Sequence, residues 1–316
     1  MEHLLQAIGI LGPTRKNRGD VLFEGFLLLM ALTLVGLVVF LFFELVLGSW
    51  PAIRAFGVRF VTSRTWDPVR DEYGALPAMY GTIVSSLLAL AVAGPVGLFS
   101  AVFLAEFAPS WLERPLSFLI ELLASIPSVV YGLWGLFVMV PLLRQVEVFL
   151  HQHAGDVPLF SCMPWGIGML AAVVILAIMI LPYSTAVARD VIRAVPRAQR
   201  EAMLALGATR WETIWHVVIP YARSGIVGGL MLALGRALGE TMAVTMLIGN
   251  RPDISLCLFN PAYTLASQIA NEFTEATSEI YLSALVELGL VLFAITFLMN
   301  ILARLLVLSM GTPGRR

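Results

Sequence analysis

The chain has 316 residues, of which 59% are apolar and only 13% are charged, and its mean hydropathy is +0.88. Soluble globular proteins average about 45–50% apolar and about 25% charged residues, so this composition excludes an ordinary soluble domain. The net charge of −1, without a basic stripe, gives no indication of nucleic-acid binding. Continuous apolar runs, each long enough to cross ~30 Å of hydrocarbon as a helix, instead predict a helical protein embedded in lipid.

Six apolar runs predict an all-α membrane protein with about six transmembrane helices, at residues 26–47, 80–104, 116–141, 165–188, 224–249 and 280–306. The first run is too long for a signal-peptide core and no small-residue cleavage site follows it, so we expect an uncleaved span. The chain then divides into an N-terminal cytoplasmic segment (1–25), a first helix with its outer loop (26–79), a transmembrane core (80–306) and a cytoplasmic tail (307–316).

Six spans place both termini on the same side of the membrane. Apart from Arg236, which lies inside a span, thirteen Lys and Arg residues fall on the side of the termini and six fall on the other side. Because basic loops stay on the cytoplasmic side, this distribution predicts that both termini are cytoplasmic. The outer segments 48–79, 142–164 and 250–279 are rich in Pro, Gly and aromatic residues and are expected to form compact lids.

The inner segment 189–223, here called the coupling loop, is polar and contains residues that typically begin and end helices. Pro196 suits the first position of a helix, and Gly207 suits the position where a helix stops. Thr209 and Glu212 then have the spacing of a capping box, which begins a second helix. The pattern predicts two short helices joined at a tight turn.

The fifth span carries a charged pair. Arg236 lies about 13 residues beyond Arg223, which corresponds to roughly 20 Å of helix and places the side chain near mid-membrane. An arginine there costs about 2.5–3.5 kcal/mol on insertion scales, so it needs a partner or a watery cavity. Glu240, four residues on, would lie on the same helical face. The guanidinium suits phosphate oxygens, with Glu240 holding it in place, although the pair could also serve only to lock the span against a neighbour.

Other polar residues of the spans give weaker signals. In the fifth span, Gly235 and Gly239 would permit close helix packing. Thr241 and Thr245 would point about 100° or more away from Arg236, so we leave them out of the core of the site. Glu44, Glu121 and Glu287 lie near span ends and are expected to reach the membrane interface.

In the third span, Pro127 removes a helical hydrogen bond and frees a carbonyl, which a membrane tolerates only beside protein or water. Ser125 and Ser128 would line such a cavity and join Arg236 and Glu240 in substrate translocation. A kink that serves packing alone explains Pro127 equally well.

Three further kinds of side chain bear on function, namely the cysteines, the histidines and the lysine. Cys162 and Cys257 both fall in outer segments and would form a disulfide in an oxidising periplasm, or else remain two unrelated buried thiols. They have no metal-type spacing, and the four histidines are scattered, so no metal site is expected. The single lysine, Lys16, is followed by Asn17 and not by a P-loop, so the chain is expected not to hydrolyse ATP by that route.

With these residues in place, the chain resembles the PstC-type phosphate permease family of ATP-binding-cassette (ABC) importers. The resemblance covers residues 74–82 and 126–135, the coupling loop, and residues 235–250 with Gly-Arg-Ala-Leu-Gly-Glu-Thr. The coupling loop matches the "EAA" pattern in Glu201, Ala202 and Gly207, followed by Ala208 and an aliphatic-x-aliphatic-Pro ending, and departs from it with Met203 at the third position.

The resemblance implies a type I ABC importer permease fold with a coupling helix, in the bacterial inner membrane. It implies a non-catalytic subunit that pairs with a second permease as a heterodimer and with two copies of an ATPase, which would contact Glu201, Ala202, Gly207 and Ala208. ATP and Mg would be bound by the ATPase, no cofactor by this chain, and a periplasmic phosphate-binding protein would deliver the substrate. A permease for sulfate, molybdate or phosphonate remains an alternative, as does a secondary transporter or channel. An intramembrane enzyme is disfavoured because no span carries a recognisable catalytic arrangement.

Overall fold

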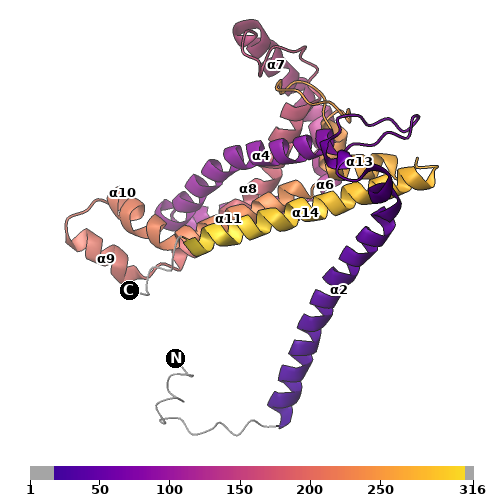
Figure 1. The fold of residues 1–316 in the computed structure, drawn as a ribbon. Helices are drawn as coiled ribbons and strands as arrows, with labels where there is room; N and C mark the ends of the chain where they lie inside the picture. The colour runs from indigo at the N-terminus through magenta and orange to yellow at the C-terminus, as the bar shows by residue number, and fades with distance from the viewer. Residues whose placement is uncertain (1–17, 310–316) are drawn as a thin grey trace. The chain divides into compact units, whose positions relative to one another are not determined.

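The computed structural model describes residues 18–309 (Figure 1). The predicted segments 1–25 and 307–316 therefore lie partly outside the described residues. The chain divides into two units, one ending at Leu47 and one beginning at Gly48. Helix α2 (Arg18–Phe56) carries the first apolar span and is continuous across that division.

The described residues contain six helices that are long and apolar enough to cross a membrane, as the sequence predicts. They are Val21–Phe56, Leu76–Phe107, Ser128–Ala154, Met169–Arg193, Arg210–Leu238 and Glu279–Ser309. Four of the predicted spans agree with these helices apart from their ends. The third and fifth differ, because each of those predicted runs contains a break in the helix.

The second unit is built around four long helices that run side by side, namely α4 (Leu76–Val102), α8 (Met169–Arg193), α11 (Ile219–Leu238) and α14 (Glu279–Ser309) (Figure 1). Small residues allow close packing: a Cβ added at Gly97 of α4 would collide with Ser184 of α8, and one at Gly229 of α11 would lie 2.9 Å from Val187 Cγ1. Backbones that approach this closely gain van der Waals contact, which drives helix association in lipid.

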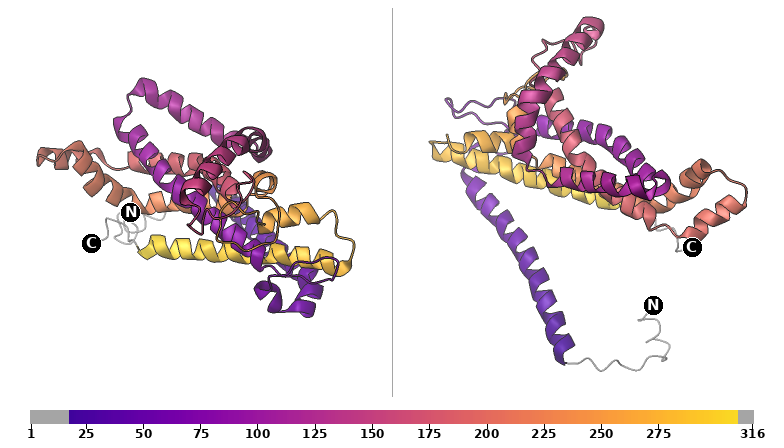
Figure 2. Two further views of the ribbon diagram at one scale, coloured as in Figure 1. Left: turned by 90° about the horizontal axis from the view of Figure 1, so that it is seen from above. Right: turned by 180° about the vertical axis from the view of Figure 1, so that it is seen from behind.

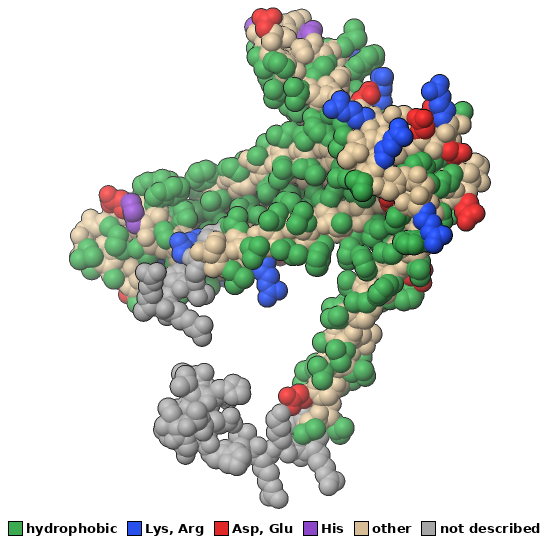
Figure 3. Space-filling view, viewed as in Figure 1, with side chains coloured by type: hydrophobic (Ala, Val, Ile, Leu, Met, Phe, Trp, Pro, Cys, Tyr) green, Lys and Arg blue, Asp and Glu red, His purple; other side chains and the backbone are tan. Residues whose placement is uncertain are grey.

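Short helices occupy the two ends of this bundle (Figure 2). At one end, α9 (Arg197–Ala205) and α10 (Arg210–Thr213) form a hairpin beyond the long helices. At the other end lie α3 (Arg59–Thr62), α7 (Val140–Ala154) and α13 (Leu265–Glu272). In this unit, hydrophobic side chains cover the visible face of the long helices and charged side chains gather towards the ends (Figure 3), as expected for spans in lipid.

The loop after the first span is held by an aromatic cluster around a carboxylate. Glu272 Oε2 accepts hydrogen bonds from Trp66 Nε1 at 2.6 Å and from the Tyr281 hydroxyl at 2.8 Å. Tyr73 stacks on Tyr281 with 5.4 Å between ring centroids, and burial raises the pKa of Tyr73 well above its usual range, so its hydroxyl stays protonated. The segment is thus compact, as the sequence predicts.

Within residues 18–309, three π-helical turns interrupt or extend the long helices: η1 (Phe103–Phe107) ends α4, η2 (Gly135–Met139) joins α6 (Ser128–Trp134) to α7, and η3 (Ile214–Val218) leads into α11. Such turns place an extra residue in the helix and frequently occur at functional sites.

Candidate functional site

Two helix breaks lie next to each other within the bundle. In the third span, α5 (Ser110–Ser125) ends before Ile126 and Pro127, and α6 begins at Ser128. In the fifth span, α11 ends at Leu238 and α12 (Met242–Leu247) begins after a gap of three residues. The half-helices that follow the breaks pack together, since a Cβ at Gly132 of α6 would lie 3.2 Å from the Cα of Ala243 in α12. The predicted span 116–141, with its kink at Pro127, and the predicted span 224–249 are therefore corrected to broken ones.

The first break is stabilised by side chains that satisfy the last carbonyls of α5. Ser125 Oγ donates to Leu122 O at 2.8 Å, and the Tyr131 hydroxyl donates to Leu123 O at 2.8 Å. The hydroxyl of Tyr183, on α8, donates to Ala124 O at 3.2 Å. Carbonyls left free within a membrane each cost several kcal/mol, so these hydroxyls make the break tolerable.

These bonds limit what the predicted serines do. The Ser125 hydroxyl is used within its own helix, and Ser128, the first residue of α6, is half-buried. Within residues 18–309 the Ser128 side chain makes no hydrogen bond, so its hydroxyl remains available. A role for either serine in translocation stays a prediction.

The second break holds the charged pair. The guanidinium of Arg236 lies 3.4 Å from Glu240 Oε2, although the helix does not continue between them as a regular α-helix. Instead, Glu240 sits in the break, where its Oε1 also accepts a hydrogen bond from Ala243 N at 3.4 Å. The Glu240 side chain is 3% exposed, whereas that of Arg236 is 40% exposed. The carboxylate is fixed inside the protein, and the guanidinium faces outward from this chain.

A third residue contacts the pair and was missed from the sequence. The Cζ atom of Arg236 lies 5.9 Å from the centroid of the Tyr183 ring, within the range of a cation–π contact. Tyr183 thereby touches Arg236 with its ring and the end of α5 with its hydroxyl. The only sequence signal was a tyrosine between Pro182 and Ser184 in a largely apolar span.

The structure corrects two details of the predicted site. A Cβ added at Gly235 meets no other atom within 4 Å, and one at Gly239 meets only Gly235 O, so neither glycine permits close packing within this chain. The argument that excluded Thr241 assumed a continuous helix; Thr241 lies in the break beside Glu240 and is half-buried. Thr245 donates to Thr241 O at 2.7 Å, within α12.

Of the three glutamates expected at the interface, Glu44 and Glu121 are exposed and only Glu287 is buried. Glu121 is exposed and forms an ion pair of 3.5 Å with Arg189 of α8. Glu287 is only 5% exposed, and its Oε2 has no hydrogen-bond partner among the described residues, so the expectation that it reaches the interface is wrong. Its position near the span end gave no sign of this burial.

The coupling loop adopts the predicted pair of short helices. Helix α9 begins after Pro196, which is the N-cap and not the first helical residue. Gly207 has a φ of +87°, a left-handed conformation that favours glycine. The capping box at the start of α10 is present, with Glu212 Oε2 accepting from Thr209 N at 2.8 Å. Glu201, Ala202 and Gly207 are exposed, and Ala208 is half-buried.

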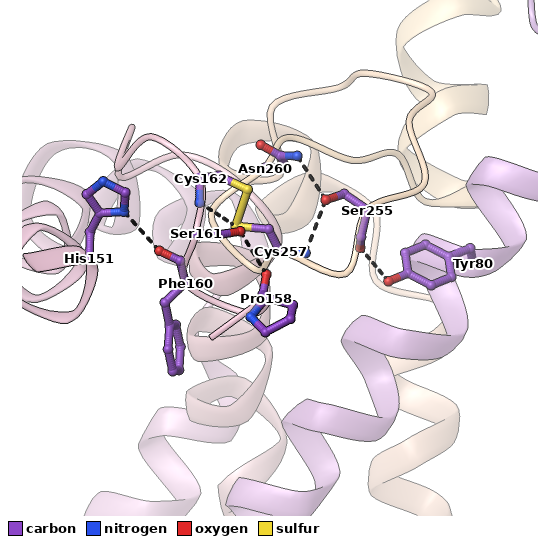
Figure 4. Close-up of a disulfide and its surroundings, with 9 residues drawn as sticks. All are labelled: Tyr80, His151, Pro158, Phe160, Ser161, Cys162, Ser255, Cys257 and Asn260. Atoms are coloured by element: carbon purple, nitrogen blue, oxygen red, sulfur yellow. Dashed lines mark hydrogen bonds between the residues drawn. A yellow bond between two sulfur atoms is a disulfide. The ribbon is translucent and has the colours of Figure 1, made fainter. Parts of the chain in front are cut away.

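The two cysteines lie together at the opposite end of the bundle (Figure 4). Cys162 and Cys257 are drawn as a disulfide with 6.2 Å between their Cα atoms, which suits such a bond. Backbone hydrogen bonds join the same two loops, including Leu258 N to Leu159 O at 3.0 Å. No group of three or more metal-ligating side chains occurs within the described part of the chain.

Comparison with known proteins decides the family. Residues 93–311 match the model of the binding-protein-dependent transport system inner membrane components. The chain belongs to this permease family. This permease is 50% identical over 266 residues to the phosphate transport system permease protein PstC of Mesorhizobium japonicum, covering 83% of this chain and 81% of the relative. It is 46% identical over 302 residues to the PstC of Haemophilus influenzae, covering 94% and 96%.

Solved structures of ABC transporters share the fold of this permease. A bacterial alginate ABC transporter, crystallised with an alginate-bound periplasmic protein, superposes with a TM-score of 0.59 at 16% identity, covering 90% of this chain and 94% of that one. The MetNI methionine transporter in inward-facing conformations gives a TM-score of 0.53 at 21% identity, covering 77% and 95%. The fold is that of a type I ABC importer permease, and the chain is a multi-pass inner-membrane protein.

Proposed function

We propose that this permease is the transmembrane subunit of an ATP-driven phosphate importer, which passes inorganic phosphate from a periplasmic binding protein to the cytoplasm. The observation that carries the proposal is the 46–50% identity to PstC permeases over most of the chain. The alternative of a secondary transporter or channel does not fit a binding-protein-dependent family.

Arg236 and Glu240 carry the proposed selectivity for phosphate. The guanidinium offers several donors in a fixed plane, which suits the oxygens of a tetrahedral oxyanion. Because the Arg236 side chain is 40% exposed on this chain, it is accessible to an anion moving past the break. The buried Glu240 offsets part of the positive charge, so the anion is released again, as conduction requires.

The exposed surface of α9 is the proposed contact with an ATPase. Glu201 and Ala202 face solvent and the turn at Gly207 is open, so a cleft in a partner can accept this helix. We propose two ATPase copies, one on this chain and one on a companion permease that completes a heterodimer. ATP and Mg would be bound on the ATPase, with this chain acting as a non-catalytic subunit without a cofactor of its own. Both termini and α9 would then be cytoplasmic, and the disulfide and α13 periplasmic.

Reconstitution tests the function directly. The complex of both permeases, the ATPase and the phosphate-binding protein is placed in liposomes, and uptake of labelled phosphate is followed with excess sulfate, molybdate or phosphonate as competitors. We expect uptake that needs ATP and the binding protein and that resists these competitors. Equal inhibition by sulfate or molybdate, or uptake without ATP, would contradict the proposal.

A further inference from the structure

Helix α9 contacts α10 and η3, but it buries little of its own surface. None of its nine residues is buried, and all except Arg200 and Met203 are exposed. A helix without an apolar buried face gains little from packing. A movement of α9 can therefore reach the membrane helices through these two residues, through the contacts of α9 with α10 and η3, and through the chain on either side.

Arg200 makes a set of strong contacts. Its Nη2 lies 2.8 Å and its Nε 3.1 Å from Glu106 Oε1, in an ion pair whose side chains are only 19% and 16% exposed. The same guanidinium donates to Ile192 O at 2.7 Å and to Val195 O. Charge-assisted bonds to a half-buried carboxylate and to carbonyls at a helix end are stronger than neutral ones. One side chain of α9 thus binds the end of α8 and the end of α4.

Glu106 lies in the π-helical turn η1, where Ala108 N donates to Phe103 O at 2.8 Å. Beside the ion pair is a cavity of about 250 Å³, lined in part by Phe107, Leu204 and Ile214. The contact shown between α9 and η1 is the Arg200–Glu106 ion pair, so this connection is mainly polar. Its strength depends on Arg200 and Glu106.

We propose that Arg200 is a coupling residue, whose ion pair with Glu106 and bonds to the end of α8 carry a displacement of α9 to α4 and α8. This inference rests on the proposed function of α9 as the contact with an ATPase. The same two helices pack on α11, and Tyr183 of α8 touches Arg236. A movement of α8 therefore reaches the break that holds Arg236 and Glu240.

The chain offers two matched controls. Arg197 is on α9, one turn earlier, is exposed, and makes no ion pair or hydrogen bond within the described residues. Arg193 pairs with Glu113 of α5 at 2.7 Å and bonds Leu104 O, without touching α9. Arg197→Gln removes a positive charge from α9 and leaves the Arg200–Glu106 ion pair in place. Arg193→Gln removes a neighbouring ion pair that does not involve α9.

The first experiment uses the complete complex in liposomes with Arg200→Gln, Glu106→Gln, the double variant and the two controls. We expect each single variant to retain the ATPase in wild-type amount and to transport at least about fivefold less phosphate per ATP hydrolysed, the lower end of typical coupling between sites. The double variant should transport no less phosphate per ATP than the less active single variant, since each single variant already removes the same interaction. The two control variants should keep the wild-type ratio of phosphate transported to ATP hydrolysed.

Two results would overturn the proposal. One is a wild-type ratio of transport to hydrolysis in Arg200→Gln. The other is loss of the ATPase from Arg200→Gln but not from Glu106→Gln, because Arg200 would then contact the partner directly and not α4.

A second experiment does not depend on the substrate. Thr241→Cys places a thiol in the break, in a background with Cys162→Ser and Cys257→Ser, and its labelling rate is measured with and without ATP and vanadate. We expect nucleotide to change the rate, and Arg200→Gln to abolish that change. If labelling responds to nucleotide but phosphate is not transported, the substrate assignment fails and the coupling role stands; an unchanged response in Arg200→Gln would overturn the coupling role itself.

Discussion

The guanidinium of Arg236 lies over the ring of Tyr183, with 5.9 Å between Cζ and the ring centroid. Such a contact contributes about 0.5–1 kcal/mol when exposed and about 2 kcal/mol or more when desolvated. The hydroxyl of Tyr183 is bonded to Ala124 O, the carbonyl next to the break in the third span. Tyr183 therefore orients the charged group relative to both breaks.

Replacing Tyr183 should separate these two contacts. Tyr183→Phe keeps the ring beneath Arg236 and loses only the bond to Ala124 O, whereas Tyr183→Leu loses both. We expect uptake close to wild type in the phenylalanine variant and a loss of about 2- to 30-fold in the leucine variant, the range that corresponds to a lost cation–π contact. Labelled-phosphate uptake at matched expression measures this.

Tyr131→Phe is the matched control for the lost hydroxyl. The Tyr131 hydroxyl bonds the neighbouring carbonyl, Leu123 O, at 2.8 Å. If the hydroxyls only stabilise the break, Tyr131→Phe and Tyr183→Phe should lower stability alike. Equal uptake in Tyr183→Phe and Tyr183→Leu would argue against a role for the ring.

Local patterns in the sequence predicted local structure well. The Thr209–Glu212 capping box and the turn at Gly207 were readable because each depends on residues within a few positions of one another. Pro127 pointed to a disturbed helix in the third span. The break in the fifth span was not readable, because hydropathy measures apolar content and does not show whether the backbone hydrogen bonds continue. Arg236 and Glu240 are paired as expected, yet through a break, so helical-wheel geometry gave the right partner for the wrong reason.

Contacts between distant segments were beyond the sequence. Arg200 and Glu106 are separated by 94 positions, and nothing in either segment alone identifies the other as its partner. Tyr183 was overlooked for the same reason, since its partners lie on α5 and α11. Such pairings depend on how the helices pack.

Gly207 gives a prediction about the coupling loop. A Cβ there has open space, with no atom within 4 Å, so a substitution is opposed by the φ of +87° and not by a clash. Gly207→Val should strain the turn, since the left-handed conformation costs ordinary residues about 1–2 kcal/mol. Asparagine adopts it more readily, so Gly207→Asn should retain much more activity. The measurement is ATP hydrolysis by the assembled complex with saturating binding protein, and equal activity of the two variants would show that the backbone conformation is unimportant.

The cysteine pair should be oxidised in the isolated protein. Cys162 and Cys257 lie with their backbones 6.2 Å apart at Cα, at the end of the bundle proposed to be periplasmic, where thiols are oxidised. Labelling under denaturation should find no free thiol before reduction and two after it. Loss of a disulfide typically costs about 2–4 kcal/mol, so Cys162→Ser with Cys257→Ser should lower the melting temperature. Two free thiols in freshly purified, unreduced protein would contradict the pairing.

Arg236 and Glu240 give the most direct test of the proposed phosphate site. Arg236→Gln removes the charge but keeps hydrogen-bonding capacity, so uptake should be abolished while the complex still assembles. Glu240→Gln is a clean probe because the amide oxygen can still accept the hydrogen bond from Ala243 N, which holds the start of α12. The arginine would then lack its counter-charge, and we expect slower release of phosphate or a less stable span.

The double variant separates a transport role from a structural one. The Glu240 carboxylate of this pair is buried. Replacing both members of a buried pair by neutral groups is often neutral or stabilising, so a purely structural role predicts that Arg236→Gln with Glu240→Gln recovers both stability and transport. A phosphate site predicts that stability recovers and transport does not, because no guanidinium remains to replace the hydration of the anion. Thr241→Val, which removes a hydroxyl bonded to Gly239 O in the same break, controls for disturbance of the backbone. Uptake of labelled phosphate, with melting temperature measured on the same preparations, distinguishes the two accounts: near-normal uptake by the double variant means that Arg236 does not bind the transported anion.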